Sequence, residues 1–265
     1  MTADDTLWCS LGFAAETSNY KSPSQIAGSL SEGWVGSHMF CPNCGAERLN
    51  QLPKNSPVAD FDCLTCGEEF ELKAKNGRLG RKVVDGAYAT MLARLKQRNN
   101  PNLLAMAYNR SSQSVTDLIL VPRYFFTETI IEAKKPTWPK GRSAPWHGCN
   151  IVLGDVPAVG RIGLIKQGQP IAKSTVLAQW QATRFLRDVK GTARGWLLDV
   201  MKAVEDIGRS EFTLEDVYAF EGRLSGLYPG NNNVRPKIRQ QLQVLRDQGF
   251  LEFTRRGEYR LRRPA

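Results

Sequence analysis

Two segments in the first third of the sequence carry side chains that could hold a divalent metal ion. Phosphodiester hydrolysis needs such an ion bound by carboxylates, usually with a lysine that positions or activates water. Glu71 and Lys73 are two residues apart in an alternating polar and apolar segment, so on a strand their side chains share one face. Asp60 belongs to the preceding strand. Together the three residues predict a metal-dependent hydrolytic site.

The spacing of this motif is not specific by itself. A second Glu-x-Lys occurs at Glu132 and Lys134, with Asp117 upstream. The alternative interpretation is that Glu71 and Lys73 form the solvated face of an edge strand. Spacing alone leaves both interpretations open.

Four of the six cysteines form two Cys-x-x-Cys pairs, Cys41 with Cys44 and Cys63 with Cys66, with 18 residues between them. Two such pairs can complete the tetrahedral shell of one Zn²⁺. A glycine after each second cysteine allows a turn in which backbone amides point at sulfur. Because the protein supplies all four ligands, we expect a structural zinc that fixes the two carboxylate-bearing strands; disulfides or unrelated thiols are the alternative.

The surrounding elements predict an α/β domain built on a mixed sheet flanked by helices. Helices are expected over 22–33 and, with an amphipathic pattern, over 85–98. Alternating or apolar runs predict strands over 58–62, 69–73, 103–108, 118–121 and 161–166. The second cysteine pair would form the connection between the first two of these strands.

The last third of the chain has a different pattern. Helices are expected over 194–205, 213–226 and 234–248, followed by a hairpin that turns at Arg256-Gly257. Three helices and a hairpin are typical of a small α+β winged helix that binds DNA. The sequence therefore predicts two domains, residues 1–189 and residues 190–265.

The charge of the chain favours a polyanionic partner. Lys and Arg number 36 against 26 Asp and Glu, and the segment 235–265 alone has nine basic and three acidic residues. No run approaches the ~18 apolar residues of a membrane span, and the first ten residues lack the basic start and apolar core of a signal peptide. These features predict a cytoplasmic protein without a membrane partner.

Several segments in both predicted domains resemble the DpnI restriction endonuclease family. The similarity runs from about residue 20 to the end of the chain. It is carried by the segments 34–35, 41–45, 57–73, 85–91, 99–102, 146–151, 194–196, 210–218, 237–247 and 256–260.

This resemblance implies a PD-(D/E)XK nuclease that needs Mg²⁺ and cuts double-stranded GATC, to blunt ends, only when the adenine is N6-methylated. Carried over, Asp60 and Glu71 become metal ligands together with the backbone carbonyl of Leu72. Lys73 becomes the residue that activates water or positions the phosphate, and the four cysteines become the zinc shell. Ala59, not proline, precedes Asp60, a departure that leaves the carboxylate in place.

Two segments could read methylated adenine. In the predicted helix 234–248, residues at i, i+4 and i+7 face the core, so the polar residues between them face outward. Asn or Gln suits adenine, Arg suits guanine or phosphate, and an added N6-methyl group needs an apolar surface. In the basic, proline-rich loop 134–148, Trp146 is the candidate for that surface, although a core tryptophan is the alternative. The predicted DNA contacts are Trp146, Arg235, Arg239, Gln240, Gln243 and Arg256.

Two other functions stay open from the residues. A non-catalytic, zinc-containing regulator would use the winged helix alone and would not need Asp60, Glu71 and Lys73 together. A nuclease of the same fold could read a different modified site. No heptad pattern suggests association, so we expect a monomer.

Overall fold

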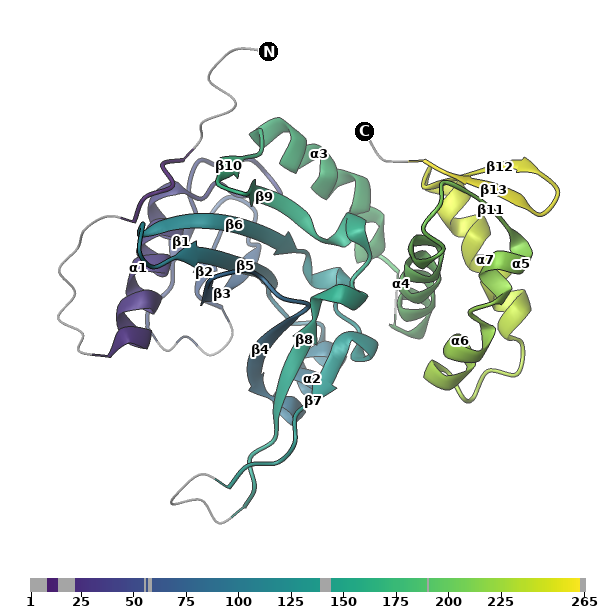
Figure 1. The fold of residues 1–265 in the computed structure, drawn as a ribbon, viewed down its shortest axis with the longest axis horizontal. Helices are drawn as coiled ribbons and strands as arrows, with labels where there is room; N and C mark the ends of the chain where they lie inside the picture. Colours follow the sequence, from purple (N-terminus) through teal and green to yellow (C-terminus); the bar gives the residue numbers. More distant parts are fainter. Residues whose placement is uncertain are drawn as a thin grey trace.

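A seven-stranded mixed sheet organises the N-terminal part of the protein (Figure 1). The computed structural model describes residues 9–13, 22–54, 56, 59–138, 144–189 and 191–262. The order of the strands across the sheet is β1-β2-β3-β5-β6-β9-β10. Their bounds are β1 (Asn50–Gln51), β2 (Phe61–Asp62), β3 (Glu69–Asn76), β5 (Asn102–Asn109), β6 (Ser114–Val121), β9 (Ile162–Lys166) and β10 (Gln169–Pro170).

Three helices flank this sheet. They are α1 (Pro23–His38), α2 (Tyr88–Gln97) and α3 (Lys173–Thr183). α1 and α3 cover one face, where Trp34 and Trp180 pack in the same buried cluster as Phe61 and Phe70. α2 covers the opposite face, where its buried residue Met91 lies in one cluster with Leu103 and Ala105 of β5. β3 and β5 are parallel, which requires a crossover connection such as the one through α2.

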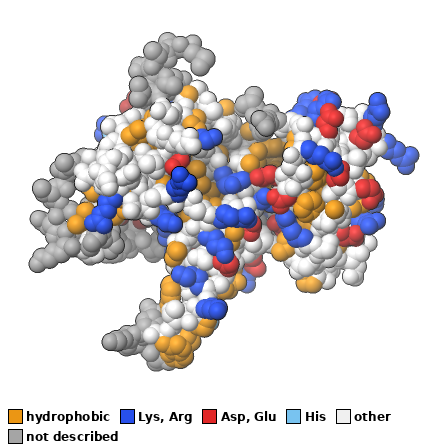
Figure 2. All heavy atoms as spheres, viewed as in Figure 1, with side chains coloured by type: hydrophobic (Ala, Val, Ile, Leu, Met, Phe, Trp, Pro, Cys, Tyr) orange, Lys and Arg blue, Asp and Glu red, His pale blue; other side chains and the backbone are white. Residues whose placement is uncertain are grey.

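A second sheet of three strands extends from the main sheet as an arm (Figure 1). It has the order β4-β8-β7, with β4 (Lys82–Ala87), β7 (Ile131–Ala133) and β8 (Gly148–Val152). On the face drawn in Figure 2, hydrophobic side chains gather at the far end of this arm. Short 3-10 turns join the elements: η1 (Arg123–Phe125), η2 (Glu128–Ile130), η3 (Leu153–Asp155), η4 (Ala158–Gly160) and η5 (Arg184–Arg187).

The C-terminal domain consists of helices packed on a small sheet. The helices are α4 (Gly191–Asp206), α5 (Leu214–Tyr218), α6 (Glu221–Leu227) and α7 (Val234–Asp247). The sheet has the order β11-β13-β12, with β11 (Glu211–Thr213), β12 (Leu251–Arg255) and β13 (Glu258–Leu261). Gly257 has a φ of +78° in the turn between β12 and β13, a conformation that favours glycine. This is the predicted hairpin.

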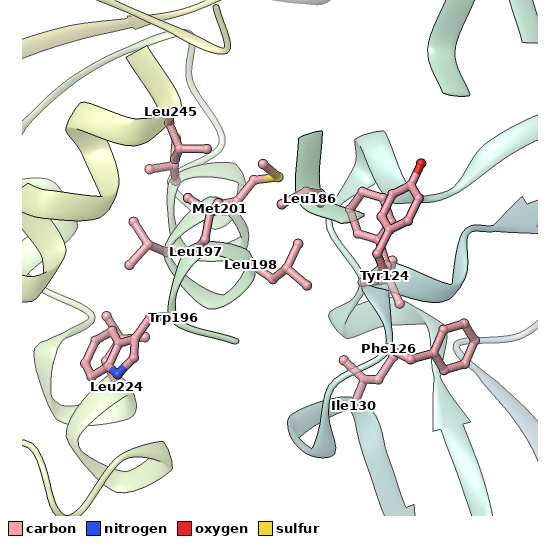
Figure 3. Close-up of a cluster of buried hydrophobic side chains, with 14 of the residues drawn as sticks. Tyr124, Phe126, Ile130, Leu186, Trp196, Leu197, Leu198, Met201, Leu224 and Leu245 are labelled. Atoms are coloured by element: carbon pink, nitrogen blue, oxygen red, sulfur yellow. The ribbon is translucent and has the colours of Figure 1, made fainter. Parts of the chain in front are cut away.

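Helix α4 joins the two parts through one continuous hydrophobic cluster. Figure 3 shows Trp196 and Leu197 pointing to the C-terminal domain, while Leu198 points toward Tyr124 and Phe126 of the N-terminal part. The buried side chains of both parts therefore form one core across α4.

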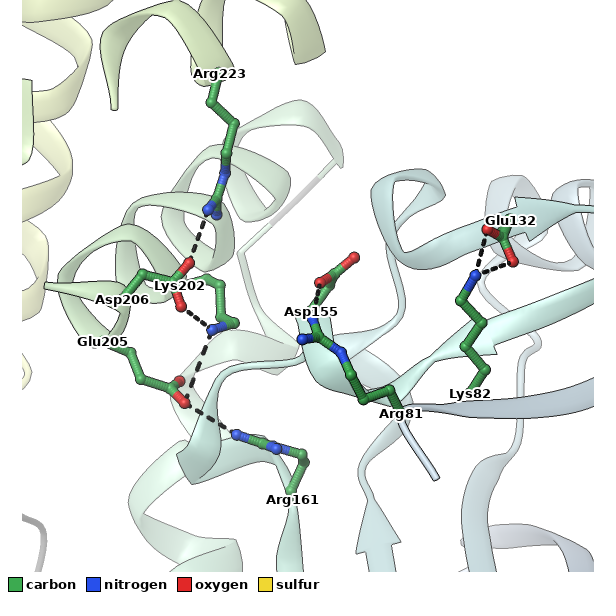
Figure 4. A network of polar contacts seen from close by, with 9 residues as sticks. All are labelled: Arg81, Lys82, Glu132, Asp155, Arg161, Lys202, Glu205, Asp206 and Arg223. Carbon is green, nitrogen blue, oxygen red and sulfur yellow. Dashed lines mark hydrogen bonds and ion pairs between the residues drawn. The ribbon is translucent and has the colours of Figure 1, made fainter. Parts of the chain in front are cut away.

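Polar contacts reinforce this junction (Figure 4). The carboxylate of Glu205 accepts a hydrogen bond from the Arg161 guanidinium at 3.0 Å and from the Ala158 N–H at 2.8 Å. The next residue, Asp206, pairs with Lys202 and, at 2.7 Å, with Arg223 of α6. The acidic end of α4 is thus tied to both parts of the molecule.

The structure corrects two predicted helices. The helix expected over 85–98 begins at Tyr88, because residues 82–87 form β4. The helix expected over 213–226 is divided into α5 and α6, and it is preceded by the unpredicted strand β11. Val58, the expected start of a strand, and Lys190, the expected domain boundary, lie outside the described residues.

The described helices include none with the length and apolar character needed to cross a bilayer.

Candidate active site and metal centre

Lys73 is the centre of a partly buried charge cluster. It lies on β3 with Glu71, and its Nζ is 2.6 Å from Oε1 of Glu71. The same Nζ is 2.8 Å from Oδ1 of Asp85, a β4 residue whose side chain is only 6% exposed. β3 is therefore not an edge strand, because β2 and β5 pair with it on its two sides, and Asp85 of the second sheet contacts Lys73.

The ionisation of this cluster follows from its burial and its charges. Burial raises the pKa of Glu71; the charge of Lys73 lowers it and that of Asp85 raises it, with a net result above the ordinary value. Burial lowers the pKa of Lys73, but the two carboxylates outweigh burial and raise it above its ordinary value. Lys73 is therefore protonated at neutral pH and shares one positive charge between two carboxylates.

Asp60 joins the cluster through the backbone of β3. Its Oδ2 accepts a hydrogen bond of 2.7 Å from the N–H of Leu72, the residue between Glu71 and Lys73. The Asp60 N–H donates to the carbonyl of Phe70 at 2.9 Å, which continues the antiparallel pairing of β2 and β3. In an antiparallel ladder the N–H and C=O of a residue face the same neighbour. The carbonyl of Leu72 is therefore directed to the Asp60 side, beyond the end of β2.

Asp60 also lines a pocket of about 570 Å³ beneath α1. Glu32 of α1 and Lys54 line the same pocket. Burial and the charge of Asp60 raise the pKa of Glu32, which shows that these two carboxylates lie within electrostatic reach of each other. Glu32 was not among the residues selected from the sequence, because its position on α1 gives no signal of the neighbouring Asp60, which lies in a bend just before β2.

The four paired cysteines converge on one point. The sulfur of Cys41 is 3.6 Å from that of Cys66, the sulfur of Cys44 is 3.5 Å from that of Cys63, and all four lie within 4.8 Å of one another. Sulfur ligands of a tetrahedral zinc with bonds of about 2.3 Å lie about 3.8 Å apart. The cysteines are thus positioned to bind a structural metal, and their geometry is compatible with zinc.

The local backbone explains this convergence. Gly45 and Gly67 have φ values of +79° and +68°, and each donates its N–H to the carbonyl of the first cysteine of its pair, at 2.8 and 2.7 Å. Burial raises the pKa of Cys63, but the N–H groups of Cys66 and Thr65 lower it to about 7. These N–H groups therefore favour the thiolate of Cys63 that a metal requires, whereas burial raises the pKa of Cys41 and Cys44.

Comparison with known families accounts for both parts of the chain. The family described as DpnI, the Dam-replacing family, matches residues 11–189, and the Dam-replacing HTH domain matches residues 192–261. The chain belongs to the Dam-replacing family. Membership implies a methylation-dependent restriction endonuclease with a C-terminal domain that binds DNA.

In the Dam-replacing HTH domain, α7 presents the predicted contact residues to solvent. Ile238, Leu242 and Leu245 are buried, as their spacing predicts. The four outward residues are all exposed, namely Arg235, Arg239, Gln240 and Gln243.

Three of these outward side chains have intramolecular partners. Arg235 pairs with Glu221 at 2.8 Å, Arg239 donates to the Tyr218 hydroxyl at 2.9 Å, and Oε1 of Gln240 accepts from Lys237 at 2.8 Å. No hydrogen bond joins the Gln243 side chain to another described residue. Gln243 is therefore the outward side chain that could contact a base without breaking an existing bond.

The other two predicted contacts lie at different ends of the molecule. Arg256 is exposed in the turn between β12 and β13. Trp146 bridges to Thr137 through two backbone hydrogen bonds of 2.7 and 3.0 Å, which continue the arm beyond β7 and β8. The Trp146 ring packs on Gly148 so closely that a Cβ there would lie 2.5 Å from it. Trp138 on the same loop is 70% exposed, and residues 139–143 lie outside the described residues.

Asp85 is the main residue of this Dam-replacing protein that the sequence motif did not include. It was expected to begin a helix, whereas it lies in β4, paired with Cys149 of β8. The contact with Lys73 depends on the packing of one sheet against another, which no local spacing reveals.

Proposed function

We propose that this protein is a methyl-directed type II restriction endonuclease that hydrolyses double-stranded DNA at GATC sites containing N6-methyladenine. In this proposal the reaction requires Mg²⁺, leaves blunt ends, and is carried out by a cytoplasmic monomer. The N-terminal domain, 1–189, supplies the reaction, and the winged helix, 190–265, supplies DNA binding.

The observation that carries the proposal is the hydrogen bond from the Leu72 N–H to Asp60. It brings the first carboxylate of the motif beside the Glu71-Leu72-Lys73 segment, although Asp60 precedes β2 and the segment belongs to β3. A regulator that used its winged helix alone would have no need for this arrangement.

The donor set suits a hard divalent cation. Asp60 and Glu71 offer carboxylate oxygens and Leu72 offers a carbonyl, all of which are oxygen ligands that Mg²⁺ prefers. Burial of Glu71 penalises its negative charge, and a bound cation would offset that penalty. When bound, Mg²⁺ would neutralise charge on the phosphate and lower the pKa of a bound water.

The role of Lys73 follows from its protonation. A lysine whose pKa is raised by two carboxylates cannot take a proton from water at neutral pH. Its three N–H groups can instead hold Glu71, Asp85 and one oxygen of the phosphate. Of the two roles expected from the sequence, we therefore favour phosphate positioning over water activation.

Two segments support recognition of methylated adenine. The free amide of Gln243 on α7 can make the paired contact to adenine in the major groove, with Arg235, Arg239 and Gln240 as further contacts once their internal bonds are exchanged. Arg256, at the tip of the hairpin, suits a phosphate. The ring of Trp146 provides an apolar surface for the added methyl group.

The test is a digest of one plasmid prepared with and without adenine methylation at GATC, using the full chain and Mg²⁺. We expect cutting of the methylated plasmid alone, and loss of cutting in Asp60→Ala. Asp62→Ala is the matched control, because Asp62 is two residues away and bonds to Asn50 outside the site. Binding without cutting by the parent protein would overturn the proposal in favour of a DNA-binding regulator.

A further inference from the structure

A small pocket between the N-terminal domain and α4 is lined by four arginines. Its volume is about 200 Å³, and the arginines come from four separate elements, the end of α2, η1, η5 and the first turns of α4. They are Arg98, Arg123, Arg187 and Arg194. None of them belongs to the motif of the proposed active site or to α7.

Only two of these four arginines pair with a carboxylate, and they share a single one. Arg123 and Arg187 both pair with Glu68, a carboxylate that is 2% exposed and also accepts from Asn102 at 3.0 Å. Arg98 and Arg194 form no ion pair with a carboxylate among the residues that the structure describes. Burial and then the charge of Arg98 lower the pKa of Arg194, so the two cations repel each other inside the pocket.

Arg194 also has a donor without an acceptor. Its Nε is buried and forms no hydrogen bond within the described residues. A buried guanidinium donor normally has a partner, because a buried donor without a hydrogen bond costs about 1–3 kcal/mol. An anion between Arg98 and Arg194 would supply the missing acceptor and relieve the repulsion of the two cations.

The start of α4 adds to the positive potential. Gly191 and Thr192 in its first turn, together with Arg98, line an adjoining pocket of about 440 Å³. The N-terminal end of a helix carries a partial positive charge and favours anions. The two pockets share Leu95, Arg98 and Arg194, so an anion bound there would face both the arginines and this end of α4.

We propose that Arg98 and Arg194 bind a phosphate group of the DNA backbone, and that this contact holds the N-terminal domain and α4 on the same duplex. The inference rests on the proposed DNA-cleaving function and adds a binding site to it. It predicts a phosphate contact distinct from those of Lys73 and of the hairpin.

The position of the pocket favours DNA over a free anion. α2 begins at Tyr88, three residues after Asp85, whose carboxylate lies 2.8 Å from Lys73 of the proposed active site, and Arg98 caps the other end of the helix. The 10 residues of α2 advance about 15 Å along the helix axis. A duplex whose scissile phosphate lies at Lys73 would therefore have further phosphates within reach of Arg98.

The experiment measures binding of the full chain, without Mg²⁺, to methylated duplexes in which one phosphate at a time is an uncharged methylphosphonate. For the parent, one position should lower affinity by about tenfold, the effect of losing one charge-assisted contact. The same position should have no effect in Arg98→Gln or in Arg194→Gln. Arg110→Gln is the matched control, since Arg110 is exposed in the turn beyond the other end of β5.

Salt dependence gives a second readout. The slope of log affinity against log salt should decrease by about one in each pocket variant and stay unchanged in Arg110→Gln. Arg98 is exposed, so Arg98→Gln tests the pocket even if Arg194→Gln proves unstable.

Three results would overturn the inference in recognisable ways. If the methylphosphonate substitutions have the same effects in the parent and in the pocket variants, and binding stays tight, then the pocket does not contact DNA phosphate. The proposed function would be unaffected by that result. Unchanged DNA binding combined with lost thermal stabilisation by inorganic phosphate would assign the pocket to a free anion. Absence of DNA binding in the parent would instead refute the proposed function itself.

Discussion

The amine of Lys73 lies 2.8 Å from the carboxylate of Asp85, which belongs to a different sheet. Glu71 competes for the same amine at 2.6 Å, so each acidic residue alters the ionisation of the others. Asp85 raises the pKa of both Glu71 and Lys73. The charge of Asp85 thus helps to set the pH range in which Glu71 is ionised and Lys73 is protonated.

Asp85→Asn should shift the pH profile of cleavage. Removing the charge lowers the pKa of Glu71, so the rate should begin to fall at a lower pH on the acidic side than in the parent. The maximum rate should fall by about 10–100-fold, because Lys73 loses one of its two anchors. Cleavage rates from pH 5 to pH 9, with Asp117→Asn as a control from β6, would measure both effects. A lower rate with an unshifted profile would mean that Asp85 holds Lys73 in place without altering the ionisation of Glu71.

Removal of the metal from the four cysteines should destabilise the N-terminal domain. Metal binding at such sites contributes on the order of 10 kcal/mol to the folding of small zinc domains, and here Cys41 and Cys63 also lie in a large buried cluster. For a chain of this size about 1 kcal/mol corresponds to about 2–4 °C, so a chelator should lower the unfolding temperature by more than about 10 °C. Cys63→Ser should do the same, whereas Cys149→Ser should respond to the chelator like the parent. An unchanged unfolding temperature after verified metal loss would refute a structural role.

The buried carboxylate of Asp199 should make stability depend on pH. Burial raises its pKa above the ordinary 3.8, although it accepts hydrogen bonds from Tyr228 at 2.6 Å and Thr129 at 3.3 Å. The folded state therefore binds this proton more tightly than the unfolded state, and stability falls as pH rises from 3.8 through the folded pKa. Asp199→Asn keeps an acceptor for Tyr228 and should flatten this dependence.

Denaturant unfolding at a series of pH values would test this expectation, with the exposed Asp155→Asn as the control. At pH 8 Tyr228→Phe should lower the free energy of unfolding by about 1–3 kcal/mol, because the buried carboxylate of Asp199 loses its main hydrogen-bond donor. Parallel pH curves for the parent and Asp199→Asn would show that the carboxylate is solvated in solution.

Sequence patterns predicted the elements that depend on their own residues. The helix α7 was predicted from the spacing of Ile238, Leu242 and Leu245, and the strand β3 from its alternating polar and apolar residues. In each element one face is buried, so apolar residues recur with the period of a helix or of a strand. The converging cysteines were predicted for the same reason, because two residues of spacing fix two ligands of one metal.

Elements and contacts that depend on distant partners were missed. Residues 85–87 were expected to begin a helix, but residues 82–87 form β4 because β8, more than 60 residues later, pairs with them. β11 exists because Phe212 pairs with Tyr259 of β13. The contact between Lys73 and Asp85 needs both sheets in place. Single-sequence spacing carries no information on such pairings.

Gln243 on α7 should contribute to sequence discrimination. Its side chain is exposed and can contact a base without losing an internal bond. Gln243→Ala should weaken binding to the methylated site by about 1–3 kcal/mol while leaving non-specific binding unchanged. Gln248→Ala, at the C-terminal end of the same helix, should leave both affinities as in the parent. Equal losses on specific and non-specific duplexes would assign Gln243 to the phosphate backbone.

Trp146 should set the dependence on methylation. Its ring is fixed against Gly148, and its backbone is paired with Thr137, so the apolar face is held on the arm in one orientation. An N6-methyl group buried on that face gains about 1 kcal/mol, and an unmethylated adenine leaves the ring exposed to water. Trp146→Ala should therefore cut methylated and unmethylated plasmids at similar, low rates, whereas Trp138→Ala, from the same loop, should keep the discrimination. If both variants still discriminate as the parent does, the methyl group is read by the winged helix, and its affinity for methylated against bare duplex should then account for the whole difference in cutting.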